Sequence, residues 1–308
     1  MSGARVADGG ERGQFAEPES WDHRYAGVGG ADLHYVAAGP EDGPLVVLLH
    51  GFPEFWYSWR GQIGPLADAG YRVLAPDLRG YNRSSKPSGV AAYDVAELVA
   101  DVTGLIDHAG RESAAVVGHD WGGLVAWHVA SRRPAAVDRL TVLNAPHPDR
   151  FERELRASPR QALRSWYVFL FQVPWLPERL LTADDCAAVA SMLREGATRP
   201  DTFTDEDVAR YREAFARPGV ATAAVNYYRA QARRTVRESL SRRGQRHDVS
   251  VPTLLLWGEQ DPALDASLTE GLGEWVPNLR VERYPDAGHW VQFDAPDRVA
   301  EALLSFLS

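Results

Sequence analysis

The sequence predicts an α/β fold, in which a mostly parallel β-sheet is flanked by helices and covered by an inserted helical cap. Apolar strand-like runs alternate with amphipathic stretches up to residue 146, and the alternation resumes at residue 249. The segment between them is rich in Leu, Arg, Ala and Glu and is too long for a simple crossover. We therefore expect a core of residues 19–146 and 249–308, a cap of residues 147–248, and a flexible arm of residues 1–18.

The first half of the core shows short apolar runs that predict strands and longer runs with a 3.6-residue period that predict helices. Glycines mark the turn of an N-terminal hairpin. The expected elements are a hairpin at 21–39, a strand at 44–51, a helix at 56–70, a strand at 71–77, a helix at 93–110, a strand at 113–120, a helix after Gly122 and a strand at 137–145.

After the cap the same alternation predicts a strand at 252–261, a helix at 264–275, a strand within 279–289 and a final helix ending near Leu307. Ligands of open α/β sheets bind beyond the carboxyl ends of the strands. A cap that leaves the sheet at one such end would cover that site.

Composition excludes several classes of function. The 308 residues carry 33 basic and 42 acidic side chains, and the resulting net charge of -9 opposes binding to nucleic acid or to an anionic membrane. The basic run at 229–247 is therefore expected to be a solvated face of the cap. The lack of a secretory apolar segment and the single cysteine, Cys186, favour the cytoplasm, with Cys186 as an apolar helix residue. No stretch is long and apolar enough to enter a membrane.

An aspartate stands where many hydrolases carry a serine nucleophile. The segment "VVGHDWGGLVAWHVA" predicts a strand, a tight turn and a helix, with Asp120 between Gly118 and Gly122. A serine alkylated at a saturated carbon becomes a stable ether, whereas an ionised carboxylate becomes an ester that water can cleave. Asp120 is thus predicted to be a nucleophile, and the alternative, a helix N-cap, leaves the glycine frame unexplained.

Two more strand ends supply the groups that such an ester needs. Asp261 and His289 follow successive predicted strands, and the order nucleophile, acid, histidine is that of a hydrolase triad. His289 would activate water and Asp261 would orient it. Glu259 is an alternative acid, two residues nearer the strand. The other histidines are expected to be structural: His119, His128 and His147 through packing, and His50 through hydrogen bonds that shape the loop after the strand at 44–51.

The blocks "HGFP", "GHDWGG", "WGEQD" and "AGHW" resemble the epoxide hydrolase branch of the α/β-hydrolases, and the resemblance covers about residues 21–307. It implies an oxyanion hole made by the backbone amides of Phe52 and Trp121. It also implies that two cap tyrosines donate to the opening epoxide oxygen. These would be Tyr167 in "YVFLFQ" and Tyr228 in "NYYRA".

Each tyrosine has a competing interpretation. Tyr167 lies in an aromatic run and could simply pack in the cap core. Tyr228 has Tyr227 beside it, and adjacent helical side chains point about 100° apart, so only one of the two can face the nucleophile. The register of the motif favours Tyr228.

The resemblance implies an epoxide and water as substrates. The sequence has no H-E-x-x-H motif and no paired-cysteine spacing, so no cofactor and no metal are expected. Trp56, Phe169 and Trp175 are expected to bind the substrate, in a pocket that Phe52, Trp59 and Phe171 also line, and these aromatic side chains favour a small apolar or aromatic epoxide. A haloalkane dehalogenase is the alternative enzyme, although that branch usually carries asparagine at the position of Phe52. A protein that binds small molecules without turnover is a further alternative. The sequence is compatible with a homodimer and leaves the natural substrate and its stereochemistry open.

Overall fold

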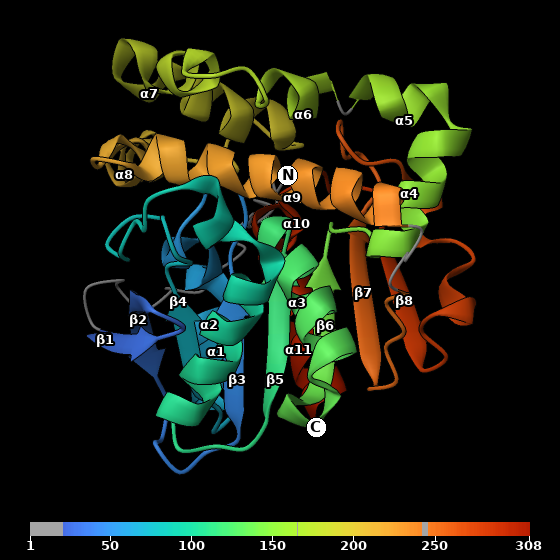
Figure 1. Ribbon diagram of the computed structural model, residues 1–308. Coiled ribbons are helices and arrows are strands. Elements are labelled where there is room, and N and C mark those ends of the chain that lie inside the picture. The colour runs from blue at the N-terminus through green and yellow to red at the C-terminus, as the bar shows by residue number, and fades with distance from the viewer. Residues whose placement is uncertain (1–20, 165, 242–245) are drawn as a thin grey trace, which may run out of the picture.

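The computed structural model describes residues 21–164, 166–241 and 246–308, and it confirms the predicted α/β fold (Figure 1). The predicted arm, 1–18, lies outside the described residues. None of the helices in the described part of the chain is long and apolar enough to cross a membrane.

In the part of the chain that the structure describes, eight strands form one sheet with the order β1-β2-β4-β3-β5-β6-β7-β8. The pairs β1–β2 and β2–β4 are antiparallel, and every other pair is parallel. The strands are β1 (Asp22–Val28), β2 (Ala31–Ala38), β3 (Leu45–Leu49), β4 (Arg72–Pro76), β5 (Ala114–His119), β6 (Val137–Leu143), β7 (Thr253–Gly258) and β8 (Leu279–Tyr284).

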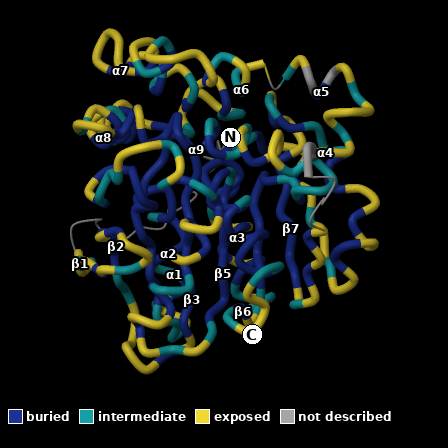
Figure 2. Tube along the Cα trace, in the orientation of Figure 1, coloured by how far each residue is buried: buried dark blue, intermediate teal, exposed yellow. Residues whose placement is uncertain are grey.

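The central strands are apolar because helices cover both faces of the sheet. Every residue of β3, β5 and β7 is buried, whereas the edge strands β1 and β8 include exposed residues (Figure 2). Helices α1 and α11 pack together, and α2 packs against α3. Helix α3 also contacts β5 and β6. The core helices are α1 (Arg60–Asp68), α2 (Val95–His108), α3 (Trp121–Arg132), α10 (Val291–Asp294) and α11 (Pro296–Leu307), with short 3-10 turns at Trp56–Trp59, Val90–Tyr93 and Pro134–Ala136.

The strand order reverses at β3, and this topology places the site. From β3 the chain crosses to β4 on one side and later to β5 on the other. The carboxyl ends of β3 and β5 therefore lie side by side, with Leu49 paired to Gly118. Such a switch point leaves a crevice between the two following loops. The loop that begins at His50 and the turn at Asp120 meet there.

Between β6 and β7 the described residues form six helices, here named the cap helices, which lie above the carboxyl edge of the sheet (Figure 1). The cap helices are α4 (Pro148–Ala157), α5 (Pro159–Arg164), α6 (Trp166–Leu170), α7 (Leu176–Gly196), α8 (Asp205–Ala216) and α9 (Val220–Ser241). Helix α9 runs across the top of the core, and α6 and α7 lie beyond it. Thr204 begins α8 with a reciprocal capping box to Asp207.

Two sequence expectations about elements were wrong. The helix expected at 264–275 is replaced by two 3-10 turns, Ala266–Thr269 and Leu272–Glu274, because Gly271 adopts a positive φ of 69° between them. Cys186 is buried, but it lies in a kink of α7 rather than in regular helix. Asp184 and Asp185 before it also have positive φ, a conformation that aspartate adopts more readily than most residues.

Candidate active site

Asp120 occupies a strained turn between β5 and α3. Its φ of 49° and ψ of -117° are unusual for a residue with a side chain, and they project the carboxylate out of the sheet. The turn is possible because glycines lie two residues before and two residues after Asp120. A Cβ on Gly122 would lie 2.1 Å from the carbonyl oxygen of Leu49, and one on Gly51 would lie 2.5 Å from the Cβ of Asp120. The glycine frame seen in the sequence is thus a steric requirement of this turn.

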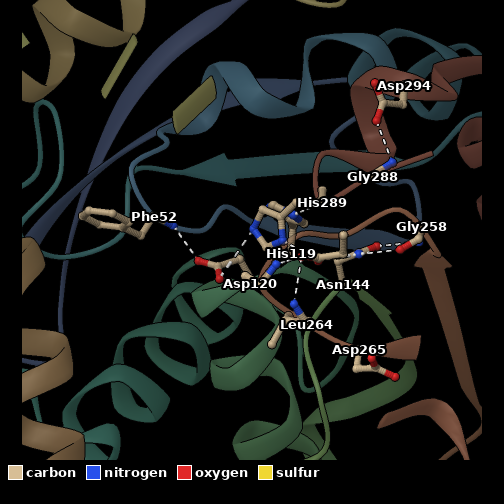
Figure 3. Close-up of polar contacts among 12 residues, drawn as sticks. Phe52, His119, Asp120, Asn144, Gly258, Leu264, Asp265, Gly288, His289 and Asp294 are labelled. Carbon is tan, nitrogen blue, oxygen red and sulfur yellow. Dashed lines mark hydrogen bonds and ion pairs between the residues drawn. The ribbon is translucent and has the colours of Figure 1, made fainter. Parts of the chain in front are cut away.

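The two carboxylate oxygens of Asp120 have different environments (Figure 3). The backbone amide of Phe52 donates to Oδ1 at 2.8 Å, and Oδ2 lies 3.8 Å from Nε2 of His289. Burial raises the pKa of Asp120, while His289, His119 and the amides of Phe52 and Trp121 oppose this rise. The N-terminus of α3 adds a favourable dipole for an anion. Oδ1 therefore sits where an oxyanion would be stabilised, and Oδ2 is the freer oxygen.

His289 is held by Asp261. Nδ1 of His289 donates to Oδ2 of Asp261 at 2.7 Å, and Nε2 points to Asp120. Burial alone lowers the pKa of His289, but the charges of Asp261 and Asp120 outweigh it and raise the pKa to about 9. Burial would likewise raise the pKa of Asp261, yet His289 and several hydrogen bonds lower it. Glu259 is exposed, so the geometry favours Asp261 as the acid.

Asn144 was missed by the sequence analysis. It follows β6, the strand between the nucleophile strand and the acid strand. Its Nδ2 donates to Oδ2 of Asp261 at 2.8 Å, and its Oδ1 accepts from the amide of Gly258 at 2.8 Å. Leu264 and Ala263 donate their amides to the other oxygen of Asp261. The only available signal was the position of Asn144 at a strand end, because no motif includes it.

A second buried acid lies beneath the site. Oε2 of Glu54 lies 2.7 Å from Nδ1 of His119 and accepts from the amide of Gly51, also at 2.7 Å. Nε2 of His119 donates to the carbonyl oxygen of His289 at 2.9 Å. Burial would raise the pKa of Glu54, but His119 lowers it. His119 thus joins the loop of the nucleophile to the loop of the base, a role beyond the packing that the sequence predicted.

His50 shapes the loop after β3, as predicted. Its Nδ1 donates to the carbonyl oxygen of Gly51 and its Nε2 accepts from the amide of Leu78, both at 2.9 Å. Burial lowers the pKa of His50, which suits an imidazole that accepts at one nitrogen.

Tyr228, rather than Tyr227, faces the nucleophile. The ring of Tyr228 lies 4.9 Å from that of Trp121 and 6.0 Å from that of Tyr167. Burial and then the charge of Asp120 raise the pKa of both Tyr167 and Tyr228, so both hydroxyls keep their protons at neutral pH. The hydroxyl of Tyr227 donates to the carbonyl oxygen of Arg79 at 2.8 Å. The structure thus places the two tyrosines favoured by the sequence together.

Three of the aromatic residues expected in the pocket make their contacts elsewhere. The ring of Trp56 packs against Trp21 and His23, beside the N-terminal hairpin. Phe169 and Trp175 are 73% and 64% exposed. The structure therefore does not group these three rings with Tyr228, because aromatic character indicates a contact surface but not the direction in which a side chain points, and their role in substrate binding stays a prediction.

Phe171, which the sequence also placed in the pocket, lies beside Tyr228 and Phe52. Its ring lies 4.7 Å from that of Tyr228 and 5.7 Å from that of Phe52. Tyr167 and Phe171 are four residues apart and share one face, whereas Phe169, two residues from each, points away. The rings of Phe52, Trp121, Tyr167 and Phe171 thus all pack against that of Tyr228.

Comparison with known proteins agrees with this geometry. Residues 44–296 match the alpha/beta hydrolase fold family. The chain is 43% identical over 284 residues to the AB hydrolase superfamily protein YfhM of Bacillus subtilis, covering 92% of this chain and 97% of that protein. It is 38% identical over 296 residues to Epoxide hydrolase 1 of Caenorhabditis elegans, covering 94% of this chain and 71% of that protein. The crystal structure of Bacillus megaterium epoxide hydrolase in complex with an inhibitor superposes with a TM-score of 0.85 at 33% identity, covering 92% and 99% of the two chains. The chain therefore belongs to the epoxide hydrolase family of α/β-hydrolase enzymes.

Proposed function

We propose that the protein opens an epoxide ring with Asp120 and hydrolyses the resulting ester to a vicinal diol. The observation that carries this proposal is the asymmetric setting of the Asp120 carboxylate, with Oδ1 held by the Phe52 amide and Oδ2 left toward His289 and the cap. Oδ2 attacks a ring carbon, the carbon–oxygen bond of the ring breaks, and the tyrosine hydroxyls donate to the departing oxygen.

The second step uses the core alone. His289 takes a proton from water, and the hydroxide attacks Cγ of the ester. The carbonyl oxygen of that ester is Oδ1, so the developing charge appears where the Phe52 amide already donates. Collapse releases the diol oxygen, which takes the proton back from His289. Asp120 is regenerated as a carboxylate with one oxygen from water, and the second proton of that water restores the tyrosine hydroxyl that protonated the departing ring oxygen.

The rings that pack against Tyr228 favour an apolar or aromatic epoxide. Phe52, Phe171 and Trp121 are each less than a tenth exposed and carry no charge. Styrene oxide is a suitable probe, and 1-bromobutane tests the dehalogenase alternative. Diol formation without bromide release supports the proposal. Bromide release without diol would indicate a dehalogenase, and saturable binding with neither product would indicate a receptor.

Tyr228→Phe is expected to slow ring opening of styrene oxide by about a hundredfold, the lower end of what a positioned general acid supplies. The matched control is Tyr227→Phe, because the Tyr227 hydroxyl donates to the backbone carbonyl of Arg79 and not toward Asp120. The rate of this variant should stay within a few-fold of the wild-type rate. Rapid-quench measurement of ester formation separates this step from hydrolysis. Equal losses in the two variants would contradict the assignment of Tyr228.

The pKa of His289 is expected to fall during the cycle. In the free enzyme it is raised to about 9, partly by the charge of Asp120. Alkylation neutralises Asp120, so that part of the shift disappears and the base becomes neutral at lower pH. The rate constant of ester hydrolysis in single turnovers should therefore rise with pH and reach a plateau, with an apparent pKa below 9. A hydrolysis step that still rises above that pH would contradict this prediction.

A further inference from the structure

The chain leaves the core for the cap at His147 and returns at His247, and these two linkers are bonded to each other. Nε2 of His147 donates to the carbonyl oxygen of His247 at 2.8 Å. Asp149, in the first turn of α4, accepts from the backbone amide of His247 at 2.8 Å and from its Nδ1 at 2.7 Å. The start and the end of the cap are thus fixed as one unit.

Arg234 of α9 connects this unit to the core. The basic run at 229–247 predicts a solvated face, but Arg234 within it is only 3% exposed. Its guanidinium lies 3.2 Å from Nε2 of His247 and 3.5 Å from Nε2 of His128, which belongs to α3, and its Nε donates to Glu238 at 2.7 Å. The rings of His128 and His247 are 4.7 Å apart. We name this group, Arg234 with His128 and His247, the clasp.

The clasp requires both histidines to be unprotonated at Nε2. A guanidinium only donates hydrogen bonds, so each Nε2 that faces Arg234 must be an unprotonated acceptor. In His247 the proton is then on Nδ1, where Asp149 accepts it. Protonating Nε2 of either imidazole would set a cation against Arg234 and remove the acceptor.

The clasp and the catalytic tyrosine join the same two helices. Tyr228 of α9 packs on Trp121 at the start of α3, and Arg234 of α9 contacts His128 further along α3. Six residues separate the two contacts on α9, about 9 Å along its axis. Helix α9 is therefore attached to α3 at two points, one beside the nucleophile and one at the clasp.

We infer that Arg234 is a positioning residue that holds α9, and with it Tyr228, on the core, and that acid releases this hold by protonating His128. The role in ring opening rests on the proposed function, whereas the attachment of α9 does not. The charged and titratable groups around the clasp are Arg132 on α3, Glu238 on α9, His147 and Asp149 at the outgoing linker, and Asp94 at the start of α2, which faces Arg132.

The electrostatics have the sign that this release requires. Burial, and then the charges of Arg234 and His247, lower the pKa of His128 well below its usual 6.5. A histidine that is neutral in the folded protein stabilises it fully above the ordinary pKa, and this stabilisation is lost as the pH falls below 6.5. His147 behaves in the same way, because burial lowers its pKa to about 4.

Hydrogen–deuterium exchange of residues 220–241, corrected for the intrinsic effect of pH, tests the attachment. In the wild type we expect exchange to be slow near pH 7.5 and at least about tenfold faster near pH 5.5. Arg234→Met should exchange rapidly at both values. The matched control is Arg233→Met, which removes an exposed neighbouring charge and should follow the wild type. The double variant His128→Gln/His247→Gln keeps acceptors that do not titrate, so acid should speed its exchange less than that of the wild type, and the remaining effect should be that of His147.

Exchange in Arg234→Met that equals the wild type near pH 7.5, or wild-type exchange that does not change with pH, would overturn the inference. If Arg234→Met does not fold, the comparison of the wild type with the double histidine variant decides. For catalysis, Arg234→Met should slow ester formation from styrene oxide by about tenfold. Tyr228→Phe should then slow ester formation by a smaller factor in the Arg234→Met background than in the wild type. Full additivity would overturn the positioning role. If the wild type forms no ester while α9 exchanges as expected, the proposed function fails and the attachment stands.

Discussion

His289→Gln mixed with styrene oxide is expected to gain the mass of one whole epoxide and to stop there. The variant keeps Asp120, the Phe52 amide and the cap tyrosines, so ring opening can proceed. It lacks the base that activates water, so the ester should persist and kcat should fall by about 10³-fold to 10⁴-fold. Intact-mass spectrometry detects the adduct, and peptide mapping locates it.

The control for this trap is the double variant Asp120→Asn/His289→Gln, in which no adduct should form. A stable adduct on any residue other than Asp120 would refute the proposed intermediate. An increase in mass equal to one butyl group after treatment with 1-bromobutane, without any increase in mass after treatment with the epoxide, would instead favour the dehalogenase alternative. Far-UV circular dichroism of each variant checks that the fold is retained.

Asp120→Asn is expected to lower kcat/KM for styrene oxide by at least about 10⁴-fold, because an amide is a poor nucleophile at a saturated carbon. The two side chains have nearly the same size, and the amide oxygen can still accept from Phe52, so the turn should survive. Diol formation under single-turnover conditions measures the loss. Glu259→Gln, which changes an exposed carboxylate on the Asp261 loop, is the matched control and should retain activity.

Isotope labelling separates attack by Asp120 from direct attack by water. In ¹⁸O-water, a single turnover of the wild type should place the label in Asp120, and the first diol should carry the oxygen that Asp120 held before. Label in the first diol with none in the protein would mean that water opens the ring, and Asp120 would then act as a base.

The core triad could be predicted because parallel strands place their carboxyl ends at one edge. Asp120, Asp261 and His289 each follow a strand, so the order of elements was enough to bring them together. Asn144 also follows a strand, but its role depends on its distance from the Asp261 carboxylate, which no local pattern reveals. The contact between Glu54 and His119 could not be predicted for the same reason, since it joins the loop after β3 to the end of β5, 65 residues away in the sequence.

The cap was harder to predict in detail. Its helical character follows from composition, but α6 has only five residues, too few for periodicity to show which face is turned inward. Phe169 and Phe171 are therefore equivalent in the sequence and opposite in the structure. Arg234 shows the same limit, because a basic run predicts solvent exposure, whereas two histidines distant in sequence bury this one arginine.

The insertion of the cap between β6 and β7 has a consequence for how such an enzyme can be altered. The proposed donors to the leaving oxygen, Tyr167 and Tyr228, lie within the insertion, whereas Asp120, Asp261 and His289 lie outside it. Selection acting on α6 and α9 can therefore change which electrophile is accepted while the groups that clear the ester stay untouched. Laboratory evolution of new specificities should accumulate its productive changes within the inserted segment.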